Sequence, residues 1–174
     1  FCKRALLQPT RSNPLKRPRG VLLLSPPGCG KSQFCKTLGK ETGRPVLTLD
    51  VGTLMGSLVG QTEERTRQAL RIIEAMAPCV LFFDEIDALG ASRQDLRQSA
   101  GRAVSNQFLQ ELDGVQAAND GVLVLGATNA PWHVDAAFRR PGRFDRVLFV
   151  APPDREARAA ILRIQLRGKP VADV

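Results

Sequence analysis

Short apolar runs alternate along this chain with longer segments in which apolar residues recur at helical spacing. The runs that have the length of buried strands are Val21–Ser25, Val46–Asp50, Val80–Phe83, Val122–Ala127 and Val147–Val150. The helical pattern covers Lys31–Thr42, Glu63–Ala77, Arg102–Leu112 and Asp154–Leu166. Strands that alternate with helices in this way form a parallel sheet covered on both faces. The pattern therefore predicts a three-layer α/β fold with a five-stranded parallel sheet.

The loop after the first strand has the residue types of a phosphate-binding loop. Its sequence SPPGCGKS, residues 25–32, fits the pattern G-x-x-x-x-G-K-[ST] except that Ser25 replaces the first glycine. Gly28 and Gly30 allow successive backbone amides to face one anion, and the following helix adds its N-terminal dipole. Lys31 is expected to reach the terminal phosphates, and the Ser32 hydroxyl is expected to bind Mg²⁺.

Two carboxylates follow the third apolar run, in the arrangement called Walker B. Asp84 is expected to hold the Mg²⁺ shell opposite Ser32, and Glu85 is expected to orient and polarise an attacking water as general base. An acidic pair after a strand is a weak signal alone. Beside a phosphate loop it becomes specific.

These motifs resemble those of the AAA family of ATPases, within the wider AAA+ group, from Arg17 onward. The most specific stretch is DAAFRRPGRFD, residues 135–145, which resembles the second region of homology of that family. By position, Arg140 and Arg143 match two arginines that enter a neighbouring subunit's nucleotide site. Without the other motifs, a surface salt-bridge cluster would be the better explanation of these arginines. Asn129 matches the sensor-1 position, although an asparagine there also suits a cap for the turn before Pro131.

The resemblance implies Mg²⁺-dependent ATP hydrolysis that drives the remodelling or unfolding of protein substrates in a ring of identical subunits, expected to be hexameric. Two alternatives stay open, a nucleotide-gated scaffolding or assembly module and a nucleic-acid motor. Under the resemblance, the catalytic residues are Glu85, Lys31, Asn129, Arg140 and Arg143. The Mg²⁺ ligands are Ser32 and Asp84, and the nucleotide contacts are Pro27, Gly28, Cys29, Gly30, Lys31, Ser32, Gln33 and Asp84.

Three loops resemble segments with which members of that family contact substrates or neighbouring subunits. The stretch Gly56–Glu63 resembles a pore loop, with Leu58 where an aromatic residue is common. Packing of Leu58 into the core is the alternative interpretation. The stretch Ala91–Arg102 lies where a second pore loop is expected, and Asp113–Val115 resembles the intersubunit signalling segment.

The chain divides into a basic linker over residues 1–19, a nucleotide-binding core over 20–152 and the start of a helical lid over 153–174. Most of the lid is expected to be missing, and a chain that begins at Phe1 is expected to be a piece of a longer protein. The net charge is +8, and the first acidic residue is Glu41. A basic arm is also typical of nucleic-acid binding, but the lack of interleaved aromatic residues beyond Phe1 favours a solvated linker.

Composition excludes several classes of protein. A hydrophobic fraction of 43% and a charged fraction of 24% are ordinary for a globular domain and exclude a disordered tail or a collagen-like fibre. The apolar runs are far shorter than the roughly 18 residues that cross a bilayer. Four cysteines without C-x-x-C or metal-ligand spacing indicate reduced thiols and a cytoplasmic location.

Overall fold

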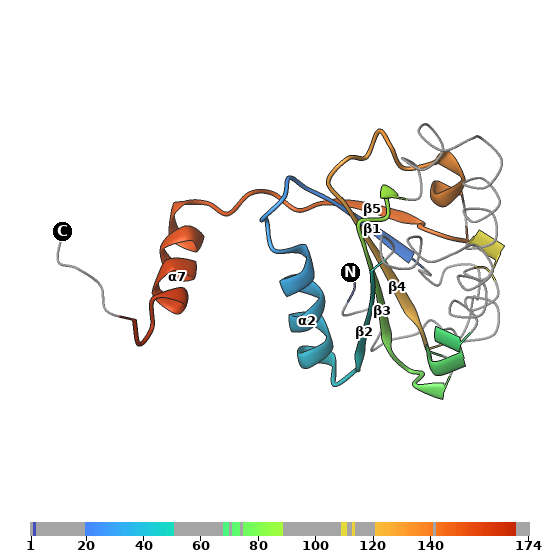
Figure 1. Ribbon diagram of the computed structural model, residues 1–174, viewed down its shortest axis with the longest axis horizontal. Coiled ribbons are helices and arrows are strands. Elements are labelled where there is room, and N and C mark those ends of the chain that lie inside the picture. Colours follow the sequence, from blue (N-terminus) through green and yellow to red (C-terminus); the bar gives the residue numbers. More distant parts are fainter. Residues whose placement is uncertain are drawn as a thin grey trace.

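Five parallel strands form the centre of this computed structural model (Figure 1). The structure describes residue 2 and residues 20–50, 68–69, 71–73, 75–88, 109–110, 113, 121–140 and 142–169. The strands are β1 (Gly20–Leu24), β2 (Val46–Asp50), β3 (Val80–Asp84), β4 (Leu123–Thr128) and β5 (Arg146–Phe149). The helices whose bounds are described are α2 (Lys31–Thr42), the 3₁₀-helix η2 (Ala136–Arg139) and α7 (Arg155–Gln165).

The strand order is β2-β3-β4-β1-β5, and each neighbouring pair is parallel. This confirms the predicted α/β fold with a five-stranded parallel sheet. Strand β2 has its predicted bounds, and the other strands differ from the predicted ones by one residue at one or both ends because backbone pairing, and not hydrophobicity, decides where they begin and end. Gly20 pairs with Val124 at the start of β1, and Leu24 pairs with Thr128 at the end of β4. All of the parallel strands end at the same edge of the sheet, which is where ligands bind in such folds.

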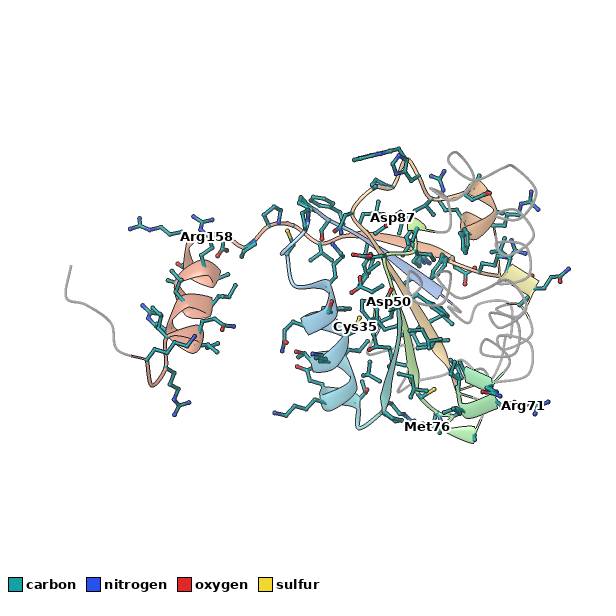
Figure 2. The ribbon with its side chains drawn as sticks, in the orientation of Figure 1. Cys35, Asp50, Arg71, Met76, Asp87 and Arg158 are labelled. Carbon is teal, nitrogen blue, oxygen red and sulfur yellow. The ribbon has the colours of Figure 1, made fainter. Side chains whose placement is uncertain are left out.

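Each face of the sheet is buried in its own core, because neighbouring side chains of a strand point to opposite faces. The α2-side core contains Val21, Leu23, Cys35, Leu38, Val80, Phe82, Leu123, Leu125 and Ala127. The opposite core contains Leu22, Ile73, Leu81, Phe83, Ile86, Leu109, Val124, Phe138 and Phe144. Figure 2 shows Cys35 between helix α2 and the sheet. Both faces are thus covered, as a three-layer fold requires.

Several predicted segments fall partly or wholly outside the described residues. In the predicted helix over Glu63–Ala77, residues 68–69, 71–73 and 75 are helical. In the predicted helix over Arg102–Leu112, residues 109–110 are helical. Leu58 and the stretch Ala91–Arg102 lie wholly outside. Of the predicted linker, residues 1–19, only Cys2 is described, and it is buried in the α2-side core.

Helix α7 stands apart from the sheet at the end of an extended segment (Figure 1). It begins after Asp154, whose side chain accepts a hydrogen bond from the Ala157 amide at 2.8 Å, and none of its residues is buried. Its exposed apolar side chains include Ile161, Leu162 and Ile164. Among the described residues, no helix is long and apolar enough to span a membrane.

Candidate functional site

A cavity of about 340 Å³ lies at the carboxyl ends of β1, β3 and β4. Its walls come from the loop after β1, the first turn of α2, the end of β3 and the turn after β4. The lining residues are Pro27, Gly28, Cys29, Gly30, Lys31, Ser32, Gln33, Asp84, Glu85 and Asn129. The structure therefore brings together every residue that the sequence predicts for phosphate, Mg²⁺ and water, whereas Arg140 and Arg143 lie elsewhere.

The loop after β1 owes its shape to two glycines in left-handed conformation, Gly28 with φ 78° and Gly30 with φ 87°. Residues with a side chain rarely adopt such φ values. The backbone conformation, and not a lack of space, therefore requires glycine at both positions. Gly30 is also the N-cap of α2, and no side chain caps this helix. The first N–H groups of α2 are therefore not used by a capping side chain, and they present an anion-binding end to the cavity.

The Lys31 ammonium is held at the centre of the cavity wall, and its residue is 7% exposed. Its Nζ donates to the Ser25 carbonyl at 3.1 Å, to Ser25 Oγ at 3.0 Å and to the Pro26 carbonyl at 3.3 Å. It also donates to Asn129 Oδ1. These acceptors are neutral, so they satisfy the donors without cancelling the charge. Lys31 therefore supplies positive potential for an anion.

Ser25, which departs from the phosphate-loop pattern, has a defined place in this arrangement. Its Oγ accepts from Lys31 and donates to the Pro26 carbonyl at 3.1 Å. A glycine could offer Lys31 only its backbone carbonyl. Serine in place of the motif's glycine thus provides one more hydrogen-bond acceptor for the Lys31 ammonium.

Ser32 and Asp84 face each other across the cavity, where Ser32 Oγ donates to Asp84 Oδ2 at 3.2 Å. The other carboxylate oxygen, Asp84 Oδ1, accepts from the Glu85 amide at 3.1 Å. A hydroxyl and a carboxylate are hard oxygen donors of the kind that Mg²⁺ prefers, and they lie beside the predicted phosphate loop. The donor set therefore fits a Mg²⁺ ion that also contacts phosphate.

Glu85 is the one described residue other than glycine with positive φ, 53°. This conformation costs about 1–3 kcal/mol and persists where surrounding contacts enforce it. Here the Ile86 amide donates to the Ala127 carbonyl at 3.0 Å, and the Ala88 amide donates to the Glu85 carbonyl at 2.9 Å. The strained turn thus holds Glu85 in the cavity lining, next to Asp84.

Asn129 follows β4, and its turn is held by the residue before it. Thr128 Oγ1 accepts from the Ala130 amide at 3.0 Å and donates to Asp87 Oδ1 at 2.6 Å. Thr128 therefore provides the cap of this turn, and the Asn129 side chain is directed to Lys31. The sequence reasoning did not single out Thr128 or Asp87. The available signal was a hydroxyl residue at the end of an otherwise apolar strand.

The arginine-rich segment is anchored by two aromatic residues, Phe138 and Phe144, which are buried in the core with ring centroids 6.3 Å apart. The Phe144 ring packs so closely on β4 that a Cβ at Gly126 would lie 2.8 Å from it. Arg140, between the two aromatic residues, is exposed. The segment thus holds its backbone against the sheet while part of it faces solvent.

Arg143 is engaged within its own chain. Its guanidinium makes a two-pronged ion pair with Asp113 at 2.9 and 2.8 Å, and it also donates to the Ala137 carbonyl at 2.8 Å. The hydrogen bond to Asp113 raises the pKa of Arg143 above its ordinary value. The Arg143 carbonyl lies beside Gly20, at the first residue of β1. Because the cavity lies at the other end of β1, Arg143 does not reach its own chain's cavity.

The loop beyond Asn129 carries an exposed aromatic pair. Trp132 is 76% exposed, and its ring meets that of His133 edge-to-face at 6.0 Å between centroids. All four cysteines are free thiols, and Cys29 is the one that lines the cavity.

Residues 21–152 match the family model described as "ATPase family associated with various cellular activities (AAA)". The cell division cycle protein 48 homolog of Archaeoglobus fulgidus is 42% identical over 94% of the chain, which corresponds to 22% of that protein. The ATP-dependent zinc metalloprotease FtsH of Veillonella parvula is 41% identical over 91% of the chain and 25% of that protein. The chain thus spans about a quarter or less of these relatives.

A solved structure with a similar fold is the FIGL-1 AAA domain in complex with ADP. It superposes with a TM-score of 0.77 and is 34% identical, over 91% of this chain and 52% of that one.

Proposed function

We propose that the cavity of this chain, which belongs to the AAA family of ATPases, binds ATP together with Mg²⁺. The chain hydrolyses this ATP, and hydrolysis drives the movement of a polypeptide. The observation that carries the proposal is the convergence of a phosphate loop, a paired hydroxyl and carboxylate, a strained glutamate and an amide on one cavity. The FIGL-1 AAA domain, whose fold this chain shares, was solved with ADP.

The phosphate loop binds the terminal phosphates of ATP. Backbone N–H groups at the start of α2 face the anion, and Lys31 exchanges neutral acceptors for phosphate oxygens. Ser32 and Asp84 hold Mg²⁺ beside them, which when bound neutralises charge on the phosphates. Pro27, Cys29 and Gln33 complete the wall.

Glu85 orients the attacking water and accepts its proton. Its carboxylate is held at the cavity by the turn after β3, so no rearrangement of the backbone is needed to bring it there. Asn129 contributes a neutral amide that hydrogen-bonds the γ-phosphate and the water. Support for this role comes from its contact with Lys31, which we propose to bind the terminal phosphates.

A second copy of the chain completes the site. Within one chain, the arginine-rich segment lies at the start of β5 and the cavity lies at the carboxyl edge of the sheet. Arg140 and Arg143 therefore act on a neighbour, in a ring that we propose to be hexameric. Arg140 is free to project because it is exposed, whereas Arg143 must first exchange or share its ion pair with Asp113. Charge neutralisation of this kind is worth about 10³ to 10⁵ in rate.

The output is remodelling or unfolding of a protein substrate. Support comes from the similarity to the cell division cycle protein 48 homolog and to a metalloprotease whose name includes dependence on ATP. Free thiols suit a cytoplasmic location. The chemistry of the cavity does not require nucleic acid.

The test is steady-state turnover of Mg-ATP against protein concentration, with Glu85→Gln as the matched variant. Turnover per chain should rise with concentration because sites form between subunits, and Glu85→Gln should lower it at least about 100-fold. Binding of a fluorescent ADP analogue should stay unchanged in the variant. Equal turnover by wild type and variant would contradict the proposal. Tight ATP binding without any turnover would favour a nucleotide-gated scaffolding module instead.

A further inference from the structure

Two turns at the carboxyl edge of the sheet are joined by a side-chain hydrogen bond next to the cavity. One follows β3 and carries Glu85, and the other follows β4 and carries Asn129. The hydrogen bond joins Thr128 Oγ1 to Asp87 Oδ1, and the two atoms are 2.6 Å apart. Figure 2 shows Asp87 at the edge of the sheet where β3 ends. Neither residue lines the cavity.

Thr128 is 1% exposed and uses its hydroxyl in two directions. It donates to Asp87 and accepts from the Ala130 amide at 3.0 Å. A hydroxyl has one proton to donate, so the direction of each hydrogen bond is fixed: the backbone N–H occupies the lone pair, and the proton goes to Asp87. Replacing Asp87 would leave the buried Thr128 hydroxyl without this acceptor for its proton.

A backbone contact runs beside this side-chain contact. The Ile86 amide donates to the Ala127 carbonyl at 3.0 Å. Residues on the two turns are thus joined at two neighbouring levels, through Ile86 to Ala127 and through Asp87 to Thr128. Glu85 directly precedes Ile86, and Asn129 directly follows Thr128. Neither Glu85 nor Asn129 can therefore shift independently of the other while both contacts hold.

We propose that Asp87 and Thr128 are positioning residues for ATP hydrolysis, which hold Asn129 in register with Glu85 without touching the nucleotide. The inference rests on the proposed function. The Asn129 amide faces Lys31 only while the turn after β4 keeps its shape, and Thr128 is the side chain that caps that turn. Asp87 fixes the Thr128 hydroxyl in the orientation that leaves its lone pair for the Ala130 amide.

The test compares Thr128→Val, which keeps volume and loses the hydroxyl, with Thr128→Ser, which keeps the hydroxyl. It also compares Asp87→Ala with Asp87→Asn, whose amide oxygen still accepts. Valine and alanine should lower kcat about tenfold, the effect of one lost positioning hydrogen bond. Serine and asparagine should stay within about threefold of wild type. Thermal unfolding shows that each variant is folded.

A double-mutant cycle with Asn129→Ala separates positioning from general damage to the fold. If Thr128 acts through Asn129, Thr128→Val should lower kcat less than about twofold once Asn129 is alanine. Losses that multiply in full in the double variant would overturn the inference. So would folded valine and alanine variants with wild-type kcat.

A further readout keeps this inference separate from the proposed function. The ratio of ATPγS affinity to ADP affinity reports the Asn129 amide at the γ-phosphate without any hydrolysis. Thr128→Val should reduce this ratio at least about threefold, and Thr128→Ser should restore it. If wild type shows no turnover, the proposed function fails, and the ratio still decides the positioning role: an unchanged ratio overturns it.

Discussion

At the scale of single residues, the Lys31 ammonium shows how this chain departs from its motif. Ser25 offers two of the oxygens that accept from Lys31, where the pattern's glycine would offer one. The additional hydroxyl competes with phosphate for the same donors. Removing it should therefore change nucleotide affinity without altering the loop's backbone.

We expect Ser25→Ala to bind a fluorescent ADP analogue up to about fivefold more tightly, because Lys31 gives up one fewer hydrogen bond, worth about 1 kcal/mol, when it turns to phosphate. A fluorescence titration of both proteins measures this. Ser25→Gly serves as the second variant, since it restores the motif's residue. Weaker binding by both variants would show instead that the hydroxyl steers Lys31 toward the phosphate.

Motifs that occupy one short stretch could be predicted from the sequence, whereas contacts between residues far apart in the chain could not. The phosphate loop and the acidic pair each occupy one short stretch, so their patterns are complete in themselves. The contact of Lys31 with Asn129 joins residues 98 apart, and that of Arg143 with Asp113 joins residues 30 apart. Such pairs depend on which strands are neighbours, which no local pattern contains. The contact between Thr128 and Asp87 could not be predicted for the same reason.

At the scale of elements, the strands could be predicted because each contains a short apolar run, and the inner strands β1, β3 and β4 are buried along nearly their whole length. Strand β2 has its predicted bounds, whereas the other strands differ by one residue at one or both ends because backbone pairing decides where a strand begins and ends, as Gly20 shows by pairing with Val124. The place of β1 in the sheet, between β4 and β5, is likewise decided by pairing. Helix α2 was predicted with its observed bounds, since a glycine stands at each end.

Helix α2 also carries the most strongly perturbed thiol among the described residues. Burial, with smaller contributions from Cys2 and Asp84, raises the pKa of the Cys35 thiol from its ordinary 9.0 to about 12. Above pH 9 the unfolded chain releases this proton while the folded chain keeps it. The contribution to stability is therefore complete below pH 9 and is lost as the pH rises toward 12.

We expect the free energy of unfolding to fall between pH 9 and pH 12, with Cys35 contributing at most about 1.4 kcal/mol per pH unit. Urea unfolding at several pH values measures the slope. Cys35→Ala should unfold more easily than wild type below pH 9 but with a smaller slope between pH 9 and pH 12. Parallel curves for the two proteins would contradict the assignment to Cys35.

At the scale of the whole molecule, the two arginines of the AAA-like segment have different surroundings. Arg143 is tied to Asp113 and to the Ala137 carbonyl, so its loss would disturb the fold as well as a neighbour's site. Arg140 is exposed. Arg140 is therefore the better residue for asking whether sites are shared between copies.

We expect Glu85→Gln and Arg140→Ala to be inactive alone and to recover turnover when mixed in equal amounts. In a ring of identical head-to-tail contacts, about a quarter of the sites would then pair an intact Glu85 with an intact Arg140. Turnover of the mixture against total concentration measures the recovery. Glu85→Gln mixed with a chain carrying both substitutions is the control and must stay inactive. A mixture as inactive as its parents, where wild type is active, would contradict a shared site.

Trp132, in the loop after β4, is an intrinsic fluorescent probe of this protein. The chain has a single tryptophan and no tyrosine, so its ultraviolet emission comes almost entirely from one indole. That indole, Trp132, is exposed in the loop that begins at Asn129. Emission maximum, quenching by iodide and polarisation therefore all describe one place, the loop that begins at the cavity-lining residue Asn129. Spectroscopy on the unmodified protein can therefore report a change in that loop when a ligand binds, with no dye attached.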